Sequence, residues 1–274
     1  MPYSKTVSRT HPTAIIFLVD QSSSMADNYG ADLQQTKAKL VADTLNRQLM
    51  ELVIRSTKGD GVRHYFDIAV IGYGRSVGPV LGGNLAGRDF LPISDIADFP
   101  LRVEEATEQD ANGEEETVRY PIWMEPVSNG STPMMQAFSS AITLVQQHIA
   151  LHPDSFPPIV INITDGEATD GDPRPLATQL RDLQTSDGNV LVYNAHISAS
   201  QEKAVILPDS AVGLPDVYAE ALYAMSSALP HVGLVRAAQL GHTTTDLSRG
   251  FIFNAPSELL VHLVDIGTST QVAR

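Results

Sequence analysis

The sequence of 274 residues contains no cysteine. This absence excludes disulfide bonds, thiolate metal sites, iron–sulfur clusters and cysteine nucleophiles. Basic residues are also scarce, because 18 lysines and arginines stand against 32 aspartates and glutamates, for a formal net charge of −14. Such a charge argues against binding to nucleic acid or to an anionic membrane surface, since both depend on lysine and arginine. It suits cations and basic protein patches instead.

Long hydrophobic runs are missing as well. The first apolar stretch, 14–19, has six residues, whereas a membrane-spanning helix needs about 20. The stretch is also shorter than the apolar part of a secretory leader. We therefore expect a cytoplasmic protein of bacterial type that has no membrane contact.

Apolar residues still make up 43% of the chain, which is enough for a large core. Short apolar runs rich in β-branched residues predict strands that are buried on both faces, at 14–19, 66–71, 158–164, 190–197 and 251–253. Helical patterns lie between them, at 31–55, 133–151, 176–183, 216–229 and 256–266. Strands that alternate with helices predict an α/β fold, in which a doubly wound, mostly parallel sheet carries helices on both faces.

The segment 72–132 carries no convincing helical pattern. Its part 102–119 holds seven acidic residues between two flanking arginines, and Asn112-Gly113 is a favoured hairpin turn. We expect an inserted hairpin with an acidic tip; a disordered loop is the alternative. The chain is then predicted to consist of an N-terminal tail 1–11, a single domain 12–268 with an insertion at about 76–127, and a C-terminal tail 269–274.

Oxygen-bearing side chains follow two of the predicted strands. Asp20, Ser22 and Ser24 come directly after the run 14–19, and Asp165 comes after the run 158–164. In an open α/β sheet, ligands bind beyond the carboxyl ends of the strands. Carboxylate and hydroxyl oxygens at such a place suit a hard divalent cation, either Mg²⁺ or Mn²⁺. Taken singly, the serines also fit the role of helix caps, and Asp165-Gly166 fits that of a turn.

A third loop, 128–132, is rich in hydroxyl groups and opens the predicted helix 133–151. Thr132 precedes Pro133, so by itself it reads as an N-cap followed by proline at the first helical position. The three loops together place oxygen at one edge of the predicted sheet. The order of the three makes a chance arrangement improbable.

The pattern Asp-x-Ser-x-Ser, a later threonine that opens a helix, and Thr-Asp-Gly resembles the metal-ion-dependent adhesion site of von Willebrand factor A domains. The residues that fill its five positions are Asp20, Ser22, Ser24, Thr132 and Asp165. The resemblance spans about 12–266. It implies that the serines ligate the ion directly, that the threonine does so directly or through water, and that the aspartates act largely through water. Within the family, we expect a stand-alone cytoplasmic member similar to the TerY-type proteins of tellurite resistance.

The resemblance implies a binding module and not an enzyme. Mg²⁺, or else Mn²⁺ or Ca²⁺, would dock an Asp or Glu side chain of a protein partner in a bacterial signalling, stress-response or assembly complex. One alternative is a Mg²⁺-dependent phosphohydrolase with Asp20 as nucleophile. Such enzymes generally have a second acid at the place of Ser22, and no lysine is evident for a phosphoryl group. The other alternative is a structural subunit that no longer uses its metal site.

Two histidines offer a separate candidate for metal binding. His148 and His152 lie four positions apart in the predicted helix 133–151, a spacing that suits zinc. No third ligand is evident from the sequence. Pro153 ends the helix, so we favour histidines that complement the negative end of the helix dipole.

Overall fold

The computed structural model describes residues 2–29, 32–109, 115–197, 203–254 and 257–268. Its centre is an eight-stranded sheet of order β15-β16-β14-β11-β1-β6-β7, in which β8 also pairs with β6. The strands of this sheet are β1 (Thr13–Asp20), β6 (Phe66–Tyr73), β7 (Val77–Pro79), β8 (Leu91–Pro92), β11 (Ile159–Thr164), β14 (Leu191–His196), β15 (Val205–Ile206) and β16 (Phe251–Phe253). Each of the five predicted runs is a strand of this sheet.

The five strands β6-β1-β11-β14-β16 are parallel, and the short strands β7, β8 and β15 pair antiparallel at the sides. After β1 the chain crosses to β6 on one side, and it later returns to β11 on the other side. The order of the parallel strands therefore reverses between β1 and β11. In doubly wound sheets this switch point is where ligands bind, beyond the carboxyl ends of the strands.

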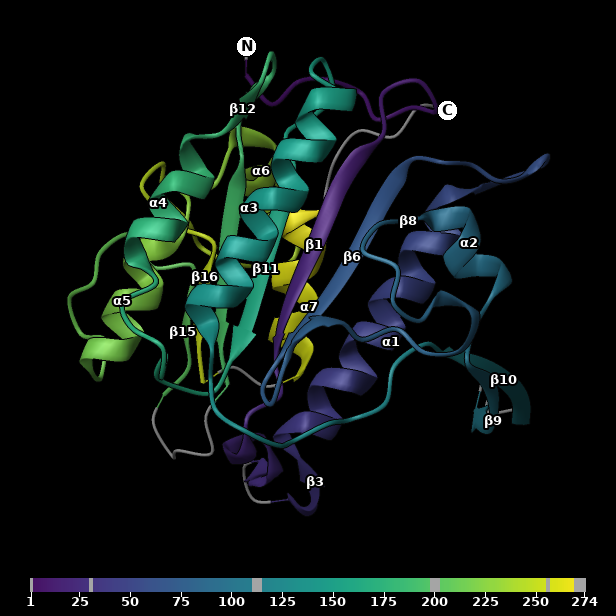
Figure 1. The fold of residues 1–274 in the computed structure, drawn as a ribbon, viewed down its shortest axis with the longest axis horizontal. Coiled ribbons are helices and arrows are strands. Elements are labelled where there is room, and N and C mark those ends of the chain that lie inside the picture. Colours follow the sequence, from purple (N-terminus) through teal and green to yellow (C-terminus); the bar gives the residue numbers. More distant parts are fainter. Residues whose placement is uncertain (1, 30–31, 110–114, 198–202, 255–256, 269–274) are drawn as a thin grey trace.

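Helices cover both faces of the sheet, with α3, α4 and α5 on one face and α1, α6 and α7 on the other (Figure 1). Their bounds are α1 (Lys37–Ser56), α2 (Ile93–Asp98), α3 (Met134–Leu151), α4 (Arg174–Asp182), α5 (Val217–Met225), α6 (His231–Gln239) and α7 (Ser257–Gly267). Alternate residues of β1 point to opposite faces. Phe17 packs in one core cluster with Leu45 of α1, and Leu18 packs in the other with Phe138 of α3. The predicted fold class, a doubly wound and mostly parallel α/β sheet, is confirmed.

The helix predicted from residue 31 was placed too early. Residues Asp32–Thr36 form β3, which pairs with β2 (Asn28–Tyr29), and α1 begins at Lys37. Thr36 caps α1, because its hydroxyl accepts a hydrogen bond from the Lys39 N–H at 3.2 Å. The backbone of Thr36 is extended, with φ −81° and ψ 159°, so the helix cannot continue past it towards the N-terminus.

The helix predicted at 216–229 was also wrong in extent, since α5 ends at Met225 and α6 follows as a separate helix that the sequence did not reveal. Ser227 explains the break. Its N–H donates to the Val192 carbonyl at 2.7 Å, and its hydroxyl accepts from the Val192 N–H at 2.9 Å. These two hydrogen bonds hold Ser227 against β14, so the helix cannot continue through it. The short helix α2 in 72–132 was missed too.

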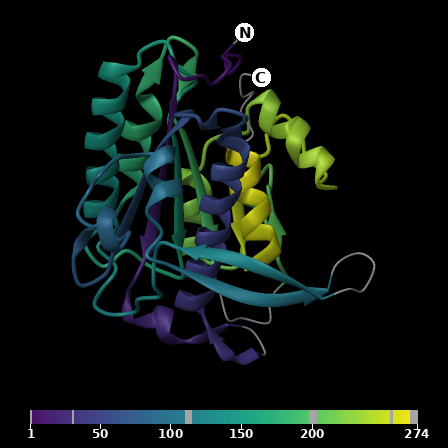
Figure 2. The ribbon, with the colours of Figure 1, turned by 90° about the vertical axis from the view of Figure 1, so that its right-hand side faces the viewer.

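The acidic segment forms a hairpin of β9 (Arg102–Gln109) and β10 (Glu115–Ile122), which makes its own two-stranded sheet and projects from the body (Figure 2). The predicted turn at Asn112-Gly113 lies outside the described residues. The base of the hairpin is packed, because Trp123 is 1% exposed and its indole N–H donates to the Ile96 carbonyl at 2.6 Å. The domain boundaries at 12, 76, 127 and 268 stay predictions.

Smaller elements complete the described chain. They are the short strands β4 (Thr57–Lys58), β5 (Gly61–Val62), β12 (Gln184–Thr185) and β13 (Gly188–Asn189), and the 3₁₀ helices η1 (Ser23–Ala26) and η2 (Gly83–Leu85). Among the residues that the structure describes, no helix combines the length and the apolar character that crossing a membrane would take.

Candidate metal-binding site

Asp20 lies at the end of β1, at the switch point of the sheet, and is 1% exposed. Its Oδ1 accepts the Ser22 N–H at 2.8 Å, and its Oδ2 accepts the Thr164 hydroxyl at 2.6 Å. Burial raises the pKa of Asp20, while the hydrogen bonds from Thr164 and Ser22 act in the opposite direction. Thr164, which sequence reasoning did not select, thus ties the ends of β1 and β11 together.

Ser22, Ser24 and Asp165 form a continuous chain of polar contacts. The hydroxyls of Ser22 and Ser24 lie 3.0 Å apart, and the Ser24 hydroxyl donates to Asp165 Oδ1 at 2.8 Å. Ser22 precedes η1, but its side chain makes no capping hydrogen bond there. Ser22 is buried and Ser24 is exposed, so the group opens to solvent on the Ser24 side.

The loop that carries Thr132 is fastened to the loop after β1. The Gly130 carbonyl accepts both the backbone N–H of Ser23, at 3.1 Å, and the Ser23 hydroxyl, at 3.0 Å. Gly130 has φ +87°, and a Cβ there would lie 2.4 Å from the backbone nitrogen of Arg75. Glycine is required at this position because the loops approach so closely.

Thr132 itself is 7% exposed and bonds through its backbone. Its N–H donates to the Thr169 hydroxyl at 3.0 Å, and its carbonyl accepts the Thr169 N–H at 2.9 Å. Within the described residues, no hydrogen bond joins its hydroxyl to Asp20, Ser22, Ser24 or Asp165. The structure therefore brings four of the five predicted ligands into direct contact and holds the fifth beside them through its loop.

Thr132 is not the cap of α3, which corrects the simpler interpretation of that residue. The residue before the helix is Pro133, and no side chain caps it locally. Asp170 does this from another loop, with its two oxygens accepting the N–H groups of Met135 and Gln136, each at 3.0 Å. A carboxylate at a helix N-terminus also complements the dipole. The Thr132 hydroxyl is thereby released from capping.

Lys37 is the residue that sequence reasoning missed at this site. Its Nζ lies 2.8 Å from Asp165 Oδ2, and the side chains of Lys37 and Asp165 are only 8% and 2% exposed. The ammonium also reaches Asp27 Oδ2 and the Ser24 carbonyl, both at 3.5 Å. One signal for it exists in the sequence: a lysine in the first turn of a helix opposes the dipole, so it needs a compensating partner.

The donor set fits a hard divalent cation. Two carboxylates and the hydroxyls of two serines meet at the switch point, with a third hydroxyl from the loop at Thr132. Such oxygens are the ligands of Mg²⁺, Mn²⁺ and Ca²⁺, and the ions that require nitrogen or sulfur are disfavoured. In the structure, the Lys37 ammonium supplies the positive charge next to Asp165 that such an ion would otherwise supply.

No protein-family model matches the sequence, and no curated protein matches it. Similar solved structures include a von Willebrand factor type A protein from Catenulispora acidiphila, at 15% identity and a TM-score of 0.46. The match covers 94% of this chain and 43% of the Catenulispora chain. They also include the ArnB paralog VWA2 from Sulfolobus acidocaldarius, at 12% identity and a TM-score of 0.36, with 71% and 36% covered. A third is the vWF domain of the type V pili tip protein Mfa5 from Porphyromonas gingivalis, at 15% identity and a TM-score of 0.32, with 58% and 39% covered. This chain thus spans less than half the length of each of the three.

Proposed function

We propose that this chain is a metal-dependent protein-binding module. A divalent ion, Mg²⁺ or else Mn²⁺ or Ca²⁺, is held by Ser22, Ser24 and Thr132 together with Asp20 and Asp165. The observation that carries the proposal is the hydrogen-bonded chain Ser22–Ser24–Asp165, which joins the ends of β1 and β11 at the switch point of the sheet.

The ion explains how an acidic protein can bind an acidic partner. With a net charge of −14, the field of the whole chain repels a carboxylate. A bound cation is the largest charge in its neighbourhood, and the neutral oxygens of the serines and of Thr132 leave it partly unneutralised. A partner's Asp or Glu side chain gains a short-range contact there, whereas the repulsion is screened beyond about 8 Å at physiological salt. The exposed position of Ser24 gives such a side chain access.

In this proposal, Lys37 lowers the affinity of the site for the metal ion. Its ammonium and a divalent ion both draw on Asp165, so the ion must displace or share the lysine contact. The ion pair keeps the carboxylate paired while no metal is bound, because an unpaired buried charge is strongly unfavourable. The affinity for Mg²⁺ is consequently lower than the five oxygen side chains alone would provide.

Lys37 also gives one specific observation in favour of the phosphohydrolase alternative, since a buried ammonium is a group that stabilises the charge of a phosphoryl group. Against it, Asp20 is 1% exposed, and the position two residues after it holds Ser22 and not a second acid. We therefore propose a module without catalytic activity. Hydrolysis of p-nitrophenyl phosphate that requires Mg²⁺ and Asp20 would favour the enzyme instead.

Adjacent serines provide a matched test of the metal site. Ser24→Ala removes the hydroxyl that contacts Asp165, whereas Ser23→Ala removes one that contacts the Gly130 carbonyl. Titration with Mn²⁺, followed by the loss of its free electron paramagnetic resonance signal, should show much weaker binding in Ser24→Ala than in Ser23→Ala, in which the Ser23 N–H still holds the Gly130 carbonyl. Equal affinity in the two variants would refute the assignment. Equal recovery of partners from a native extract with Mg²⁺ and with EDTA would refute the metal-dependent binding. Cytoplasmic location, bacterial origin and the TerY-like subgroup stay predictions, as does the structural-subunit alternative.

A further inference from the structure

A second group of metal-ligating side chains lies at the opposite edge of the sheet. Asp67 is near the beginning of β6, His148 is in the last turn of α3, and His152 directly follows that helix. One ligand atom from each of the three lies within 4.8 Å of the others. Asp67 lies six residues before Tyr73, the last residue of β6, which pairs with Asp20. At the rise of an extended strand, six residues place Asp67 about 20 Å from the switch point. This group is therefore separate from the site at Asp20.

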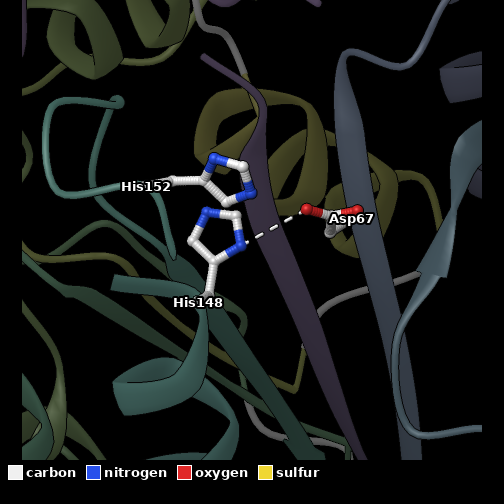
Figure 3. Close-up of side chains that lie close together, drawn as sticks. All are labelled: Asp67, His148 and His152. Atoms are coloured by element: carbon white, nitrogen blue, oxygen red, sulfur yellow. Dashed lines mark ion pairs between the residues drawn. The ribbon is translucent and has the colours of Figure 1, made fainter. Parts of the chain in front are cut away.

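The three side chains point toward a common space (Figure 3). His148 Nδ1 lies 3.4 Å from Asp67 Oδ2, and the ring of His152 lies beside that of His148 with 4.8 Å between the centroids. Zinc binds nitrogen and oxygen at about 2.0–2.2 Å in a tetrahedron, which sets neighbouring ligand atoms about 3.3 Å apart. The His148–Asp67 separation already matches. His152 is only half-buried, so its ring can turn the remaining distance.

The surroundings of His148 leave its ring free to act as a ligand. The residue is 3% exposed, and within the described structure its Nε2 is buried without a hydrogen-bond partner. Its Nδ1 faces Asp67 Oδ2, so this is the ring nitrogen placed to bind a cation that Asp67 also contacts. Phe90, whose ring centroid is 6.0 Å away, packs against the imidazole.

His64 holds the carboxylate in place. Its Nε2 lies 2.6 Å from Asp67 Oδ1, which leaves Oδ2 directed at His148. His64 is therefore a positioning residue of the kind that orients metal ligands from outside.

We propose that Asp67, His148 and His152 form a binding site for a transition-metal ion of the zinc class, with water in the fourth position. Two imidazoles and one carboxylate are a ligand set that zinc uses, and the rings of His148 and His152 lie side by side next to Asp67. Nitrogen ligands distinguish this site from the oxygen ligands at Asp20, because Mg²⁺ and Ca²⁺ prefer oxygen alone.

The test is a calorimetric titration of the full chain with Zn²⁺, with Mg²⁺ in excess so that the oxygen site does not contribute. One equivalent of Zn²⁺ should bind. His152→Ala and Asp67→Asn should each weaken binding at least tenfold, the scale on which even indirect metal contacts act. His64→Gln should weaken it less, because His64 acts through Asp67. Titration with Co²⁺ supplies a second readout, since a tetrahedral site with nitrogen ligands gives an intense visible absorption band.

His262→Ala is the matched control, because His242 and His262 form another close histidine pair, with Nε2 and Nδ1 2.9 Å apart. This variant should bind Zn²⁺ as the parent chain does. His152 is half-buried at a helix end, so its removal should leave thermal unfolding cooperative. The proposal is overturned if the parent chain binds no Zn²⁺, if either His152→Ala or Asp67→Asn binds with unchanged affinity, or if the loss appears in His262→Ala.

Discussion

The two ends of the central parallel strands carry different sets of metal-ligating side chains. Beyond the carboxyl ends of β1 and β11, the five predicted ligands all offer oxygen, and the ammonium of Lys37 pairs with the buried Asp165. At the amino end of β6, two imidazoles lie beside one carboxylate, and a further histidine, His64, contacts Asp67. The same sheet thus presents a hard and a softer ligand set, and ligand chemistry predicts that the two edges select different ions.

The strongest challenge to this comparison is a change at Asp20. Asp20→Ala should weaken Mg²⁺ or Mn²⁺ binding by about 10- to 100-fold, because Asp20 orients Ser22 and Thr164 at the site. Zn²⁺ binding at the other edge should not change. Titration of the variant with each ion measures both effects. Asp20→Asn keeps an acceptor for the Ser22 N–H, so it separates the effect of losing the charge from the effect of losing the side chain's shape. Unchanged Mn²⁺ binding in both variants would show that Asp20 is not part of the metal site.

Lys37→Met tests the charge balance at the carboxyl edge. It leaves the buried Asp165 carboxylate unpaired, which should lower the free energy of unfolding by about 3 kcal/mol when no metal is present. Mg²⁺ should restore more stability to this variant than to the parent chain, because the ion no longer competes with the ammonium. Urea unfolding with Mg²⁺ and with EDTA measures this. Lys39→Met is the control, since Lys39 pairs with Asp43 on the exposed surface. An equal gain from Mg²⁺ in all three chains would contradict the competition.

The hairpin β9–β10 should be dispensable for both edges. Replacement of 104–116 by a short linker should change the free energy of unfolding by only about 1 kcal/mol, because the hairpin forms a separate sheet and loop closure depends weakly on length. Mn²⁺ and Zn²⁺ titrations should be unaffected. Loss of cooperative thermal unfolding would show that the hairpin, and not only its base at Trp123, belongs to the core.

The sequence predicts best where one local pattern decides the structure. The run 14–19 is apolar on both faces and rich in β-branched residues, which favours a buried parallel strand, and β1 has these residues at its centre. Sequence reasoning missed Lys37 because its ion pair joins residues 128 positions apart. It missed Asp67 for the same reason: the aspartate lies in an apolar strand, and only the packing of α3 on the sheet brings it to His148.

Local patterns also fail where a distant partner competes with them. Residues 216–229 read as one helix, yet the bonds of Ser227 to β14 end it early. Thr132 before Pro133 reads as an N-cap, yet Asp170 takes that role from another loop. The grouping of Asp20, Ser22, Ser24 and Asp165 could be foreseen because the carboxyl ends of parallel strands lie at the same end of a sheet. Their role as metal ligands stays a prediction.

The smallest expected effect concerns the second histidine pair, His242 and His262. Burial, and then the charge of His262, lowers the pKa of His242. The unfolded chain therefore binds more protons at this residue, so its contribution to stability should fall as pH drops through the usual histidine value of about 6.5 towards the lowered pKa. Because His242 is largely solvated, the change should stay below about 0.5 kcal/mol. Urea unfolding from pH 7.5 to 5 should show a weaker pH dependence in His242→Gln than in the parent chain. An identical pH dependence in the two chains would show that protonation of His242 does not destabilise the folded state.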